Sequence, residues 1–550
     1  MQLLTPVDLG PVTLPNRVVS TSHQTGLVHD HLPTPDLVAY HAARARGGAG
    51  AIFLEATAVD PTGLLTAHTL GGFLPGIAAG YERLAATLHA HGTKLFVQLF
   101  HGGREQISAP PRAAAVAPSA VPSPRFKAEP RALSAAELRE LLRGYERSAR
   151  LCRAGGVDGI EVSVSHGYLI AQFFSPATNR RGDAYAAPLR FATEVLAAVR
   201  AAAGPALAVG LRLSADELTP DGLDAEQCAE IAAALATTGL VDFASCVLGH
   251  SAYVPSSTWI VPPPPLPADA LERPLTRMRA AVDVPLIGTT GVYELAAAER
   301  LVAAALEAAA HGDAVTLFER ADGIGGQLRL AGRAPAHAEM WRRWHSGAAG
   351  RLAAAPVDLR VAHDATVAEL DAADVVVLAT GARPYWPAWA TPGMLDAWEA
   401  IAEPAAVAGP VLVADWGGGW DGLDAAEVLA ESGLDVTLAC AAPCPGETPH
   451  QYQRNLYLAR CDERGIGIRH HTELVPGPVL RHLCSGRVSP LPDVATVVFA
   501  QGRRPADRLW EALEGAPGRV RAGDVLGPRS AEEATLEGVR ALQAARSAVS

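Results

Sequence analysis

From the amino terminus to about residue 300, short apolar runs alternate with longer segments that carry apolar residues at helical spacing. The apolar runs predict strands, and segments such as 135–154 and 189–203 predict helices between them. Strands that alternate with helices are typical of βα units and a parallel sheet. A closed (β/α)₈ barrel needs eight strands, and this part of the chain offers seven. The predicted strands are residues 17–20, 51–55, 94–99, 159–164, 208–213, 243–248 and 285–288.

After about residue 305 the pattern predicts Rossmann-like halves. Segment 314–319 (AVTLFE) is a strand that ends in an acid, 375–381 (VVVLATG) is another strand, and 411–414 leads into a glycine-rich turn. Gly417, Gly419 and Gly422 form G-x-G-x-x-G there, between a strand and a helix, and 436–438 is the next strand. Such glycines permit a tight turn and the close approach of a pyrophosphate to a helix N-terminus. The order predicts dinucleotide binding, and a merely structural turn is the alternative.

The strand at 159–164 runs directly into polar residues. Ser163, His166 and Tyr168 follow one another at its carboxyl end, and in a parallel barrel such ends face the mouth of the active site. A histidine and a phenol there could protonate a substrate. The alternative for His166 is a buried histidine with a purely structural role.

Composition narrows the class of protein. The chain has 550 residues, 49% of them hydrophobic, and a net charge of −12, which excludes a mainly disordered chain and argues against a nucleic-acid partner. Prolines interrupt the uncharged stretch 243–268, so no membrane span is expected, and no signal peptide is evident, which predicts a cytoplasmic location. The seven cysteines lack cluster or zinc spacing, so no metal site is expected.

Several ordered motifs resemble the old yellow enzyme family in its long form, similar to 2,4-dienoyl-CoA reductases and the FadH-like oxidoreductases associated with mycofactocin. The resemblance covers nearly the whole chain. It rests on segments 14–27 (LPNRVVSTSHQTGL), 53–63 (FLEATAVDPTG), 97–105 (VQLFHGGRE), 158–183, 211–217 (LRLSADE) and 285–291 (PLIGTTG).

The resemblance implies an α/β chain with an FMN-binding TIM (β/α)₈-type barrel, followed by Rossmann-like domains for FAD and NAD(P)H. The expected boundaries are 1–303 for the barrel, 304–395 for a partial FAD-binding domain, 396–495 for an NAD(P)-binding domain and 496–550 for the return segment of the FAD-binding domain. FMN is the expected cofactor of the barrel, with FAD as a further one.

Flavin contacts carry over position by position. Ala56 matches a small residue against the flavin ring, Gln98 a glutamine at its pyrimidine edge, and Arg212 an arginine that stabilises the charge of the reduced ring. Arg212 could instead be a solvated charge at the barrel rim, and His23 would contribute its backbone rather than its ring. The other implied contacts are Ser22, His23 and Gln24 after the first strand, and Gly288, Thr289, Thr290 and Gly291 around the phosphate.

The resemblance also implies a reaction. Tyr168 aligns with the proton donor and His166 with the second member of the histidine or asparagine pair that holds a substrate carbonyl. Ser163 stands where the first member is usual, and His250 resembles an additional active-site histidine. The expected reaction is hydride transfer from the flavin to an activated alkene, with protonation by Tyr168. The alkene would belong to an unsaturated carbonyl compound or an unsaturated acyl-CoA.

In the second half, Glu319, Gly381 and Asp524 match FAD contacts. Gly417, Gly419 and Gly422 would hold NAD(P)H, and neither NADH nor NADPH is favoured. The interval between Gly291 and residue 314 is too short for three pieces that the family has there: the eighth barrel strand, a cysteine-rich loop for an iron-sulfur cluster, and the first glycine loop of the FAD domain. A fused deletion near 303–305, with no iron-sulfur cluster, is therefore expected.

Two other functions remain open at this point. One is a catalytically inactive remnant or binding protein that keeps the barrel residues as a scaffold. The other is a dehydrogenase or demethylase that acts on amines or alcohols, as other long members of the family do. The sequence does not predict the oligomeric state.

Overall fold

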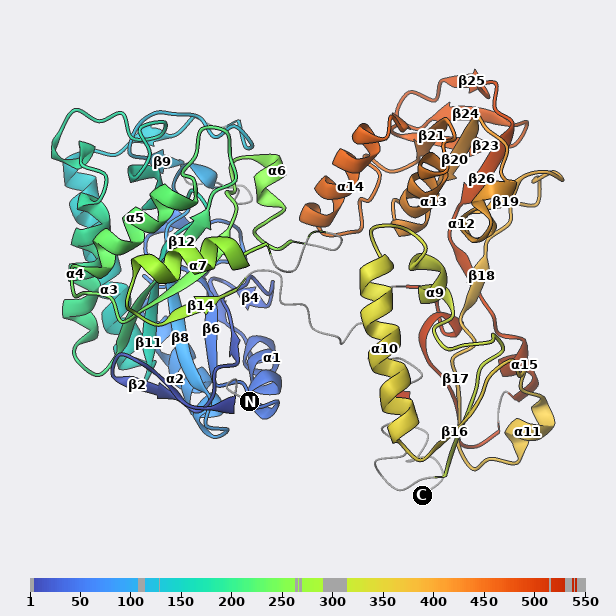
Figure 1. Cartoon of the computed structure of the whole chain (residues 1–550), viewed down its shortest axis with the longest axis horizontal. Helices are drawn as coiled ribbons and strands as arrows, with labels where there is room; N and C mark the ends of the chain where they lie inside the picture. The colour runs from blue at the N-terminus through green and yellow to red at the C-terminus, as the bar shows by residue number, and fades with distance from the viewer. Residues whose placement is uncertain are drawn as a thin grey trace. The chain divides into compact units, whose positions relative to one another are not determined.

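The computed structural model describes residues 4–106, 114–127, 129–262, 266, 270–289, 314–513, 516–529, 537–538 and 540–541. The chain divides into two compact units, the first made of Met1–Pro262 and Pro267–Val292, the second of Pro263–Leu266 and Tyr293–Ser550. Figure 1 shows the strands and helices of each unit.

The first unit is built on a parallel sheet whose strands follow one another in chain order. Its path is β14-β13-β12-β11-β8-β6-β3, with β7 (Leu70–Gly71) paired to β6. The seven predicted strands are confirmed, and neighbours in sequence are neighbours in the sheet, as βα units require. Among the described residues β14 pairs only with β13 and β3 only with β6, while the interval 290–313 lies outside them. The strands are β3 (Val19–Ser20), β6 (Ala51–Ala58), β8 (Lys94–Phe100), β11 (Gly159–Val164), β12 (Ala208–Asp216), β13 (Phe243–Leu248) and β14 (Leu286–Gly288).

Two strands extend three residues beyond their predicted ends, and β8 extends by one. β6 continues through a bulge between Leu54 and Thr57, and β12 through another between Ser214 and Asp216. Polar residues end the apolar run in both cases, but pairing with the next strand continues to the mouth of the sheet. The short strands of this unit are β1 (Val7–Leu9), β2 (Val12–Leu14), β4 (Val28–His29), β5 (Leu32–Pro33), β9 (Val116–Ala117) and β10 (Arg131–Ala132).

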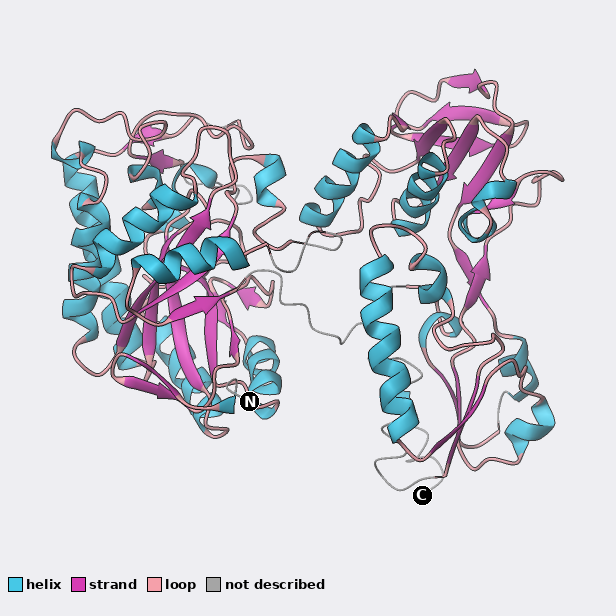
Figure 2. Ribbon diagram, viewed as in Figure 1, coloured by secondary structure: helices cyan, strands magenta, loops and turns pink. Residues whose placement is uncertain are grey.

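Helices cover the outside of this sheet (Figure 2). The predicted helix 135–154 is confirmed as α3 (Ala135–Ala154), and α4 (Arg190–Ala203) begins one residue after its predicted start. α3 begins where it does because Ser134 and Glu137 form a capping box, each accepting the backbone N–H of the other, which stabilises a helix start by about 1 kcal/mol. The other helices are α1 (Pro35–Arg46), α2 (Ile77–His89), α5 (Ala225–Ala236), α6 (Val254–Ser257) and α7 (Glu272–Ala281).

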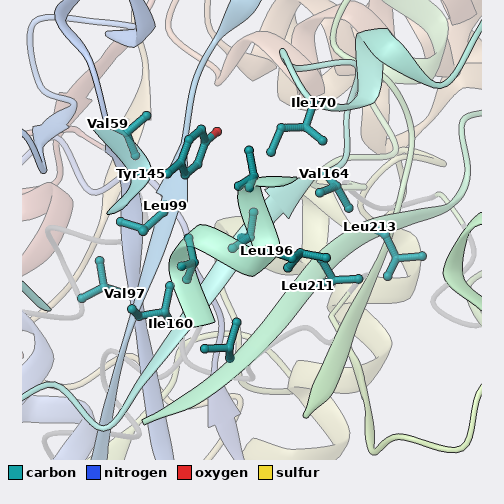
Figure 3. Packing of buried hydrophobic residues seen from close by; sticks show 14 of the residues in the cluster. Val59, Val97, Leu99, Tyr145, Ile160, Val164, Ile170, Leu196, Leu211 and Leu213 are labelled. Carbon is teal, nitrogen blue, oxygen red and sulfur yellow. The ribbon is translucent and has the colours of Figure 1, made fainter. Parts of the chain in front are cut away.

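The main core lies between the outer face of the sheet and these helices. Successive side chains of a strand point to opposite faces of the sheet. The outward positions of β8, β11 and β12 are apolar, and the positions between them face inward. Part of this core, drawn in Figure 3, consists of Val97, Leu99, Ile160, Leu211 and Leu213 from the strands, with Tyr145 and Leu196 from α3 and α4.

Phenylalanine rings form the floor on the inner side. Phe53 stacks on Phe96 with ring centroids 4.6 Å apart, and Phe96 meets Phe243 edge-on at 5.5 Å. Glycines on neighbouring strands leave room for them: a Cβ at Gly159 would lie 2.3 Å from the ring of Phe96, and one at Gly210 would lie 2.4 Å from that of Phe243. The hairpin of β1 and β2 packs its leucines against these rings, so apolar side chains fill the inside of the sheet at this end.

The second unit contains a five-stranded parallel sheet in the order β19-β26-β20-β21-β22. The strands predicted at 411–414 and 436–438 are confirmed as β20 and β21. β15 pairs with β16, and β17 with β28, in two separate parallel pairs, while β18 and β27 are antiparallel. β26 belongs to the five-stranded sheet, so the segment predicted as 496–550 begins inside that sheet. The bounds are β15 (Val315–Phe318), β16 (Val357–Arg360), β17 (Val376–Leu378), β18 (Ala382–Pro384), β19 (Leu395–Asp396), β20 (Val411–Asp415), β21 (Val436–Cys440), β22 (Gly467–Arg469), β23 (Thr472–Val475), β24 (Val479–His482), β25 (Val488–Pro490), β26 (Thr496–Ala500), β27 (Arg503–Pro505) and β28 (Arg519–Arg521).

Helices of the second unit flank its sheets (Figure 2). They are α9 (Gln327–Ala331), α10 (Ala338–Ala354), α11 (Val367–Asp371), α12 (Ala397–Ala402), α13 (Trp420–Glu431), α14 (Gln451–Glu463) and α15 (Arg508–Leu513). In the described part of the chain, no helix has the length and apolarity needed to cross a membrane.

Candidate functional site

A layer of polar side chains lies directly above the phenylalanine floor of the first unit. Gln98, Glu161, Arg212 and Ser245 each follow the floor residue of their strand by two positions, so they face the same inner side. All four are buried. The Nε2 of Gln98 donates to Oε2 of Glu161 at 2.6 Å, and the strand register places Arg212 beside Ser245.

Arg212 fits a cofactor that carries negative charge. Its Nη1 is buried without a hydrogen-bond partner among the described residues, as are the Oε1 of Glu161 and the Oγ of Ser245. Burial lowers the pKa of Arg212, and the nearby Glu161 and Tyr168 act in the opposite direction. A buried cation with an unused donor is costly alone and favours an electron-rich partner. The reduced flavin ring is such a partner, so the residues of this layer fit FMN.

The three predicted catalytic residues come together at the carboxyl ends of β11 and β13. The backbones of His166 and His250 form a parallel bridge, and the ring centroids of His166 and Tyr168 lie 6.1 Å apart. Tyr168 meets Phe100 edge-on at 4.7 Å and is half-buried, whereas both histidines are buried. Tyr168 is therefore the most open of the three, above the layer that contains Arg212.

Both histidines at this mouth are neutral. Burial, together with the charge of Arg212, lowers the pKa of His166 to about 3, and burial with the charge of Arg104 does the same for His250. The Nδ1 of His166 lies 3.2 Å from the carbonyl oxygen of Gly249, which can only accept, so its hydrogen is on Nδ1 and Nε2 is an acceptor. In His250 the Nδ1 accepts the N–H of Ala252 at 3.0 Å, so Nε2 carries the hydrogen. The pair offers one acceptor and one donor.

The turn between His166 and Tyr168 requires glycine. Gly167 has φ of +73°, and a Cβ there would lie 2.0 Å from Nε2 of His250. His166 itself has φ of +57°, which residues with a side chain rarely adopt. Its N–H donates to Oγ of Ser214 at 3.1 Å, so the sheet below holds this conformation. Backbone of this kind is concentrated at functional sites.

The predicted contacts after the first strand are partly engaged within the protein. The Nδ1 of His23 lies 2.7 Å from a backbone carbonyl two residues earlier, and its Nε2 lies 2.6 Å from the hydroxyl of Tyr40. The ring of His23 is thus occupied, and its backbone is what it can offer a ligand. The exposed Gln24 donates from Nε2 to Oγ1 of Thr66, and Ser22 is half-buried.

Ala56 lies within the bulge of β6. It is the one residue of this strand that is not fully buried, because the bulge turns it from the regular alternation. Ser163, in the place of the usual first anchor, is buried and pairs in register with Arg212. Both placements are compatible with a ligand above the polar layer.

The predicted phosphate loop is only partly described. Gly288 ends β14, and the backbone N–H and Oγ1 of Thr289 each donate to the carbonyl oxygen of Cys246 at 3.2 Å. Thr290 and Gly291 lie outside the described residues. The backbone N–H of Thr289 is therefore used by the sheet, and the role of this loop stays a prediction.

Two residues of the polar layer, and Glu55 on the neighbouring strand β6, were not predicted from the sequence. Glu161 and Ser245 interrupt strands that are otherwise apolar, and a charged side chain inside such a strand is the signal that could have found Glu161. Glu55 accepts the N–H and the hydroxyl of Thr25 at its Oε2, at 3.1 and 2.6 Å, and burial raises its pKa.

The predicted FAD contacts in the second unit are tied to one another. The Oδ2 of Asp524 accepts from Nε2 of Gln327 at 3.0 Å and from Nη1 of Arg503 at 2.8 Å. Gly381, with φ of +75°, lies beside Gln327, while Glu319 accepts the N–H of its own turn at 2.8 Å. The chain itself thus neutralises Asp524, and FAD binding stays a prediction.

The glycine triplet lies where the sequence predicts, between β20 and α13. Gly418 has the positive φ of +61° that the tight turn needs, and Gly419 caps the helix. At Gly422 a Cβ would lie 2.7 Å from Cβ of Asp415, so helix and strand approach closely here. The turn has the form of a nucleotide-binding loop. Whether it can bind a nucleotide depends on whether its backbone N–H groups are free.

Comparison with protein families also divides the chain into two parts. The model of the NADH:flavin oxidoreductase / NADH oxidase family matches residues 2–305, and that of the pyridine nucleotide-disulphide oxidoreductases matches 302–519. The chain therefore belongs to the NADH:flavin oxidoreductase / NADH oxidase family. Its α/β fold combines the parallel barrel-type sheet of that family with a Rossmann-like second unit.

Two curated relatives align with most of the chain. N,N-dimethylglycine/sarcosine dehydrogenase of Chromohalobacter salexigens is 27% identical over 574 aligned positions, covering 83% of this chain and 82% of the relative. The "multifunctional alkene reductase/demethylase OYE" of Caballeronia cordobensis is 27% identical over 577 positions, covering 86% and 83%. Each alignment has more positions than the 550 residues of the chain, so these relatives contain residues with no counterpart here.

Among solved structures, histamine dehydrogenase from Rhizobium sp. 4-9 has a TM-score of 0.83 at 19% identity, covering 98% of this chain and 96% of that one. At this identity the likeness concerns the fold alone. The link to mycofactocin, the specific likeness to 2,4-dienoyl-CoA reductases and the fused deletion stay predictions.

Proposed function

We propose that the chain is an FMN-dependent NAD(P)H oxidoreductase that reduces the activated C=C bond of an unsaturated carbonyl compound or acyl-CoA. The observation that carries the proposal is the half-buried phenol of Tyr168 above a buried layer in which Nη1 of Arg212 has no hydrogen-bond partner among the described residues. Family membership supports the flavin and the nicotinamide nucleotide. The name of the relative from Caballeronia cordobensis, an alkene reductase and demethylase, supports alkene reduction.

Each residue of the site has a role in this proposal. FMN, when bound, supplies the hydride. Gln98 and Arg212 hold the electron-rich edge of the ring, where a fixed cation stabilises added charge. The N–H of His250 is the donor available to a substrate carbonyl, and the hydroxyl of Tyr168 gives its proton to the α-carbon. Because both histidines are neutral, Tyr168 is the general acid of this site.

The variant Tyr168→Phe tests the central role. It removes the proton donor and retains the ring, so flavin reduction by NAD(P)H should be unchanged, while reoxidation by an enone slows by about two to four orders of magnitude. Stopped-flow absorbance of the flavin measures both half-reactions. Tyr145→Phe is the matched control, because its hydroxyl is buried on the outer side without a partner among the described residues.

Two results would contradict the proposal. A purified chain that is soluble and folded but colourless after incubation with FMN would favour the inactive or binding protein. Equal slowing of both half-reactions by Tyr168→Phe would show that the phenol serves flavin binding and not protonation.

Oxidation of an N-methylated amine is a second candidate function. The Nε2 of His166 is an acceptor, which suits the N–H of an ammonium substrate better than a carbonyl, and both relatives described above have dehydrogenase or demethylase names. Steady-state assays of one preparation with an enone and with sarcosine or dimethylglycine separate the two functions. Turnover of the amines alone would assign the second.

A further inference from the structure

The glycine loop of the second unit can bind a dinucleotide only if its backbone N–H groups are free. A pyrophosphate sits on such loops because several N–H groups and the helix N-terminus point at it without a competing negative charge. In this chain the loop is Gly417, Gly418 and Gly419, between β20 and α13.

A carboxylate of the chain already engages two of these donors, the N–H groups of Gly417 and Gly418. Asp415 is the last residue of β20 and its exposure is 3%. Its Oδ1 accepts the N–H of Gly418 at 3.3 Å, and the N–H of Gly417 also faces the carboxylate. On the other side, Sγ of Cys440 donates to Oδ2 at 3.6 Å. The side chain is thus enclosed beneath the loop.

At Gly418, the outer side of the loop is contacted by the segment 447–448. The backbone N–H and the Oγ1 of Thr448 both approach the carbonyl oxygen of Gly418, at 3.3 and 3.4 Å. A Cβ added to Gly418 would meet Cβ of Glu447 at 3.2 Å. Asp421 adds a further acid in the first turn of α13, where its Oδ2 lies 3.8 Å from Nε of Arg503. A pyrophosphate at this loop would approach the carboxylates of Asp415 and Asp421, which repel it.

We propose that Asp415 occupies the anion-binding position of this loop from within the chain, so that the loop binds no nicotinamide dinucleotide and NAD(P)H reacts at the mouth of the first unit. The first part rests on the geometry of the second unit alone. The second part rests on the proposed function.

ADP-ribose is the probe, since it carries the adenosine pyrophosphate without a reactive ring, and its 2′-phosphate derivative serves for NADP. Gly419→Ala is the blocking variant. Gly419 has φ of −89° and its nearest neighbour would lie 3.9 Å from a Cβ, so the methyl fits the fold but obstructs a pyrophosphate. Gly350→Ala in α10, where a Cβ has nothing within 4 Å, is the matched control.

Calorimetric titration of the full chain at pH 7.5 should give the same isotherm for the native protein, Gly419→Ala and Gly350→Ala. Asp415→Ala should gain binding of ADP-ribose, and adding Gly419→Ala to it should weaken that binding at least tenfold. Asp415→Ser replaces Asp415→Ala if the circular dichroism or unfolding temperature of the latter shows misfolding.

Native binding that Gly419→Ala weakens tenfold would overturn the proposal. A folded Asp415 variant that gains no loop-dependent binding would overturn the assignment of the block to this carboxylate. In kinetics, the KM for NAD(P)H should change less than twofold in Gly419→Ala. If no variant turns over NAD(P)H but the isotherms are as expected, the proposed function is refuted. The assignment of Asp415 to the glycine loop would still hold in that case.

Discussion

At the scale of single residues, the first unit contains several histidines that are kept neutral by burial. The pKa is lowered to about 3 for His41, His166 and His250, and to about 4 for His101. Two of them lie at the mouth, so between pH 5 and 8 their charge does not change. On the proposed function, their fixed hydrogens orient a ligand and the phenol of Tyr168, which follows the turn at His166 and Gly167, donates the proton.

His41 gives this burial a measurable consequence. Its folded pKa of about 3 lies below the ordinary histidine value of 6.5. Between these values the unfolded chain binds one more proton, so the free energy of unfolding falls as the pH falls. Both ring nitrogens lack a partner among the described residues. His41→Leu should therefore remove about 1 kcal/mol per pH unit of this dependence. Urea unfolding at pH 5 and 6 measures it.

The exposed His91, replaced by Gln, is the control for that measurement and should leave the dependence unchanged. Equal pH dependences in the native protein and in His41→Leu would mean that His41 is solvated or partnered in solution.

At the scale of elements, the alternation of apolar runs with helical segments predicted the strands, but it did not predict which side chains gather on the inner face of the sheet. The apolar runs at 159–164 and 243–248 coincide with β11 and β13 because both faces of a barrel strand are buried. The layer that contains Glu161 and Ser245 could not be predicted in this way, because these residues are brought together only by the register of β11, β12 and β13. Tyr168 was predictable from its place after a strand, whereas the contact of Asp415 with its own glycine loop was not, because a G-x-G-x-x-G pattern says nothing of where an adjacent carboxylate points.

The floor of the barrel depends on small residues opposite large ones. Gly210→Ala places a methyl 2.4 Å from the ring of Phe243, so overpacking should lower the free energy of unfolding by about 1–3 kcal/mol. Differential scanning calorimetry of the full chain should show a lower temperature for the transition of the first unit. Gly182→Ala, with nothing within 4 Å of its Cβ, should leave it unchanged, and Phe243→Leu should restore part of the loss in the double variant. An unchanged transition in Gly210→Ala would show that the ring is free to move.

At the scale of the whole molecule, the two units differ in how their polar groups are engaged. The mouth of the first unit gathers Tyr168, His166 and His250 above a buried guanidinium that has one donor without a partner among the described residues. In the second unit the corresponding polar groups are engaged by the chain: Arg503 pairs with Asp524, and the glycine loop donates to Asp415. The family models meet at residues 302–305, close to the end of the first unit at Val292, but matching a family model does not decide whether a loop has free donors. On the proposed function, reductant and oxidant must then use one mouth in turn.

That arrangement has a kinetic signature. If NAD(P)H and the alkene bind at the same mouth, the first product must leave before the second substrate binds, so double-reciprocal plots at several fixed enone concentrations should be parallel lines. Each substrate should also inhibit competitively against the other at high concentration, because both need the space beside Tyr168. Gly419→Ala should give the same pattern, since the loop of the second unit takes no part. Intersecting lines, or inhibition by the enone that is not competitive with NAD(P)H, would indicate two separate sites and return the glycine loop to the catalytic cycle.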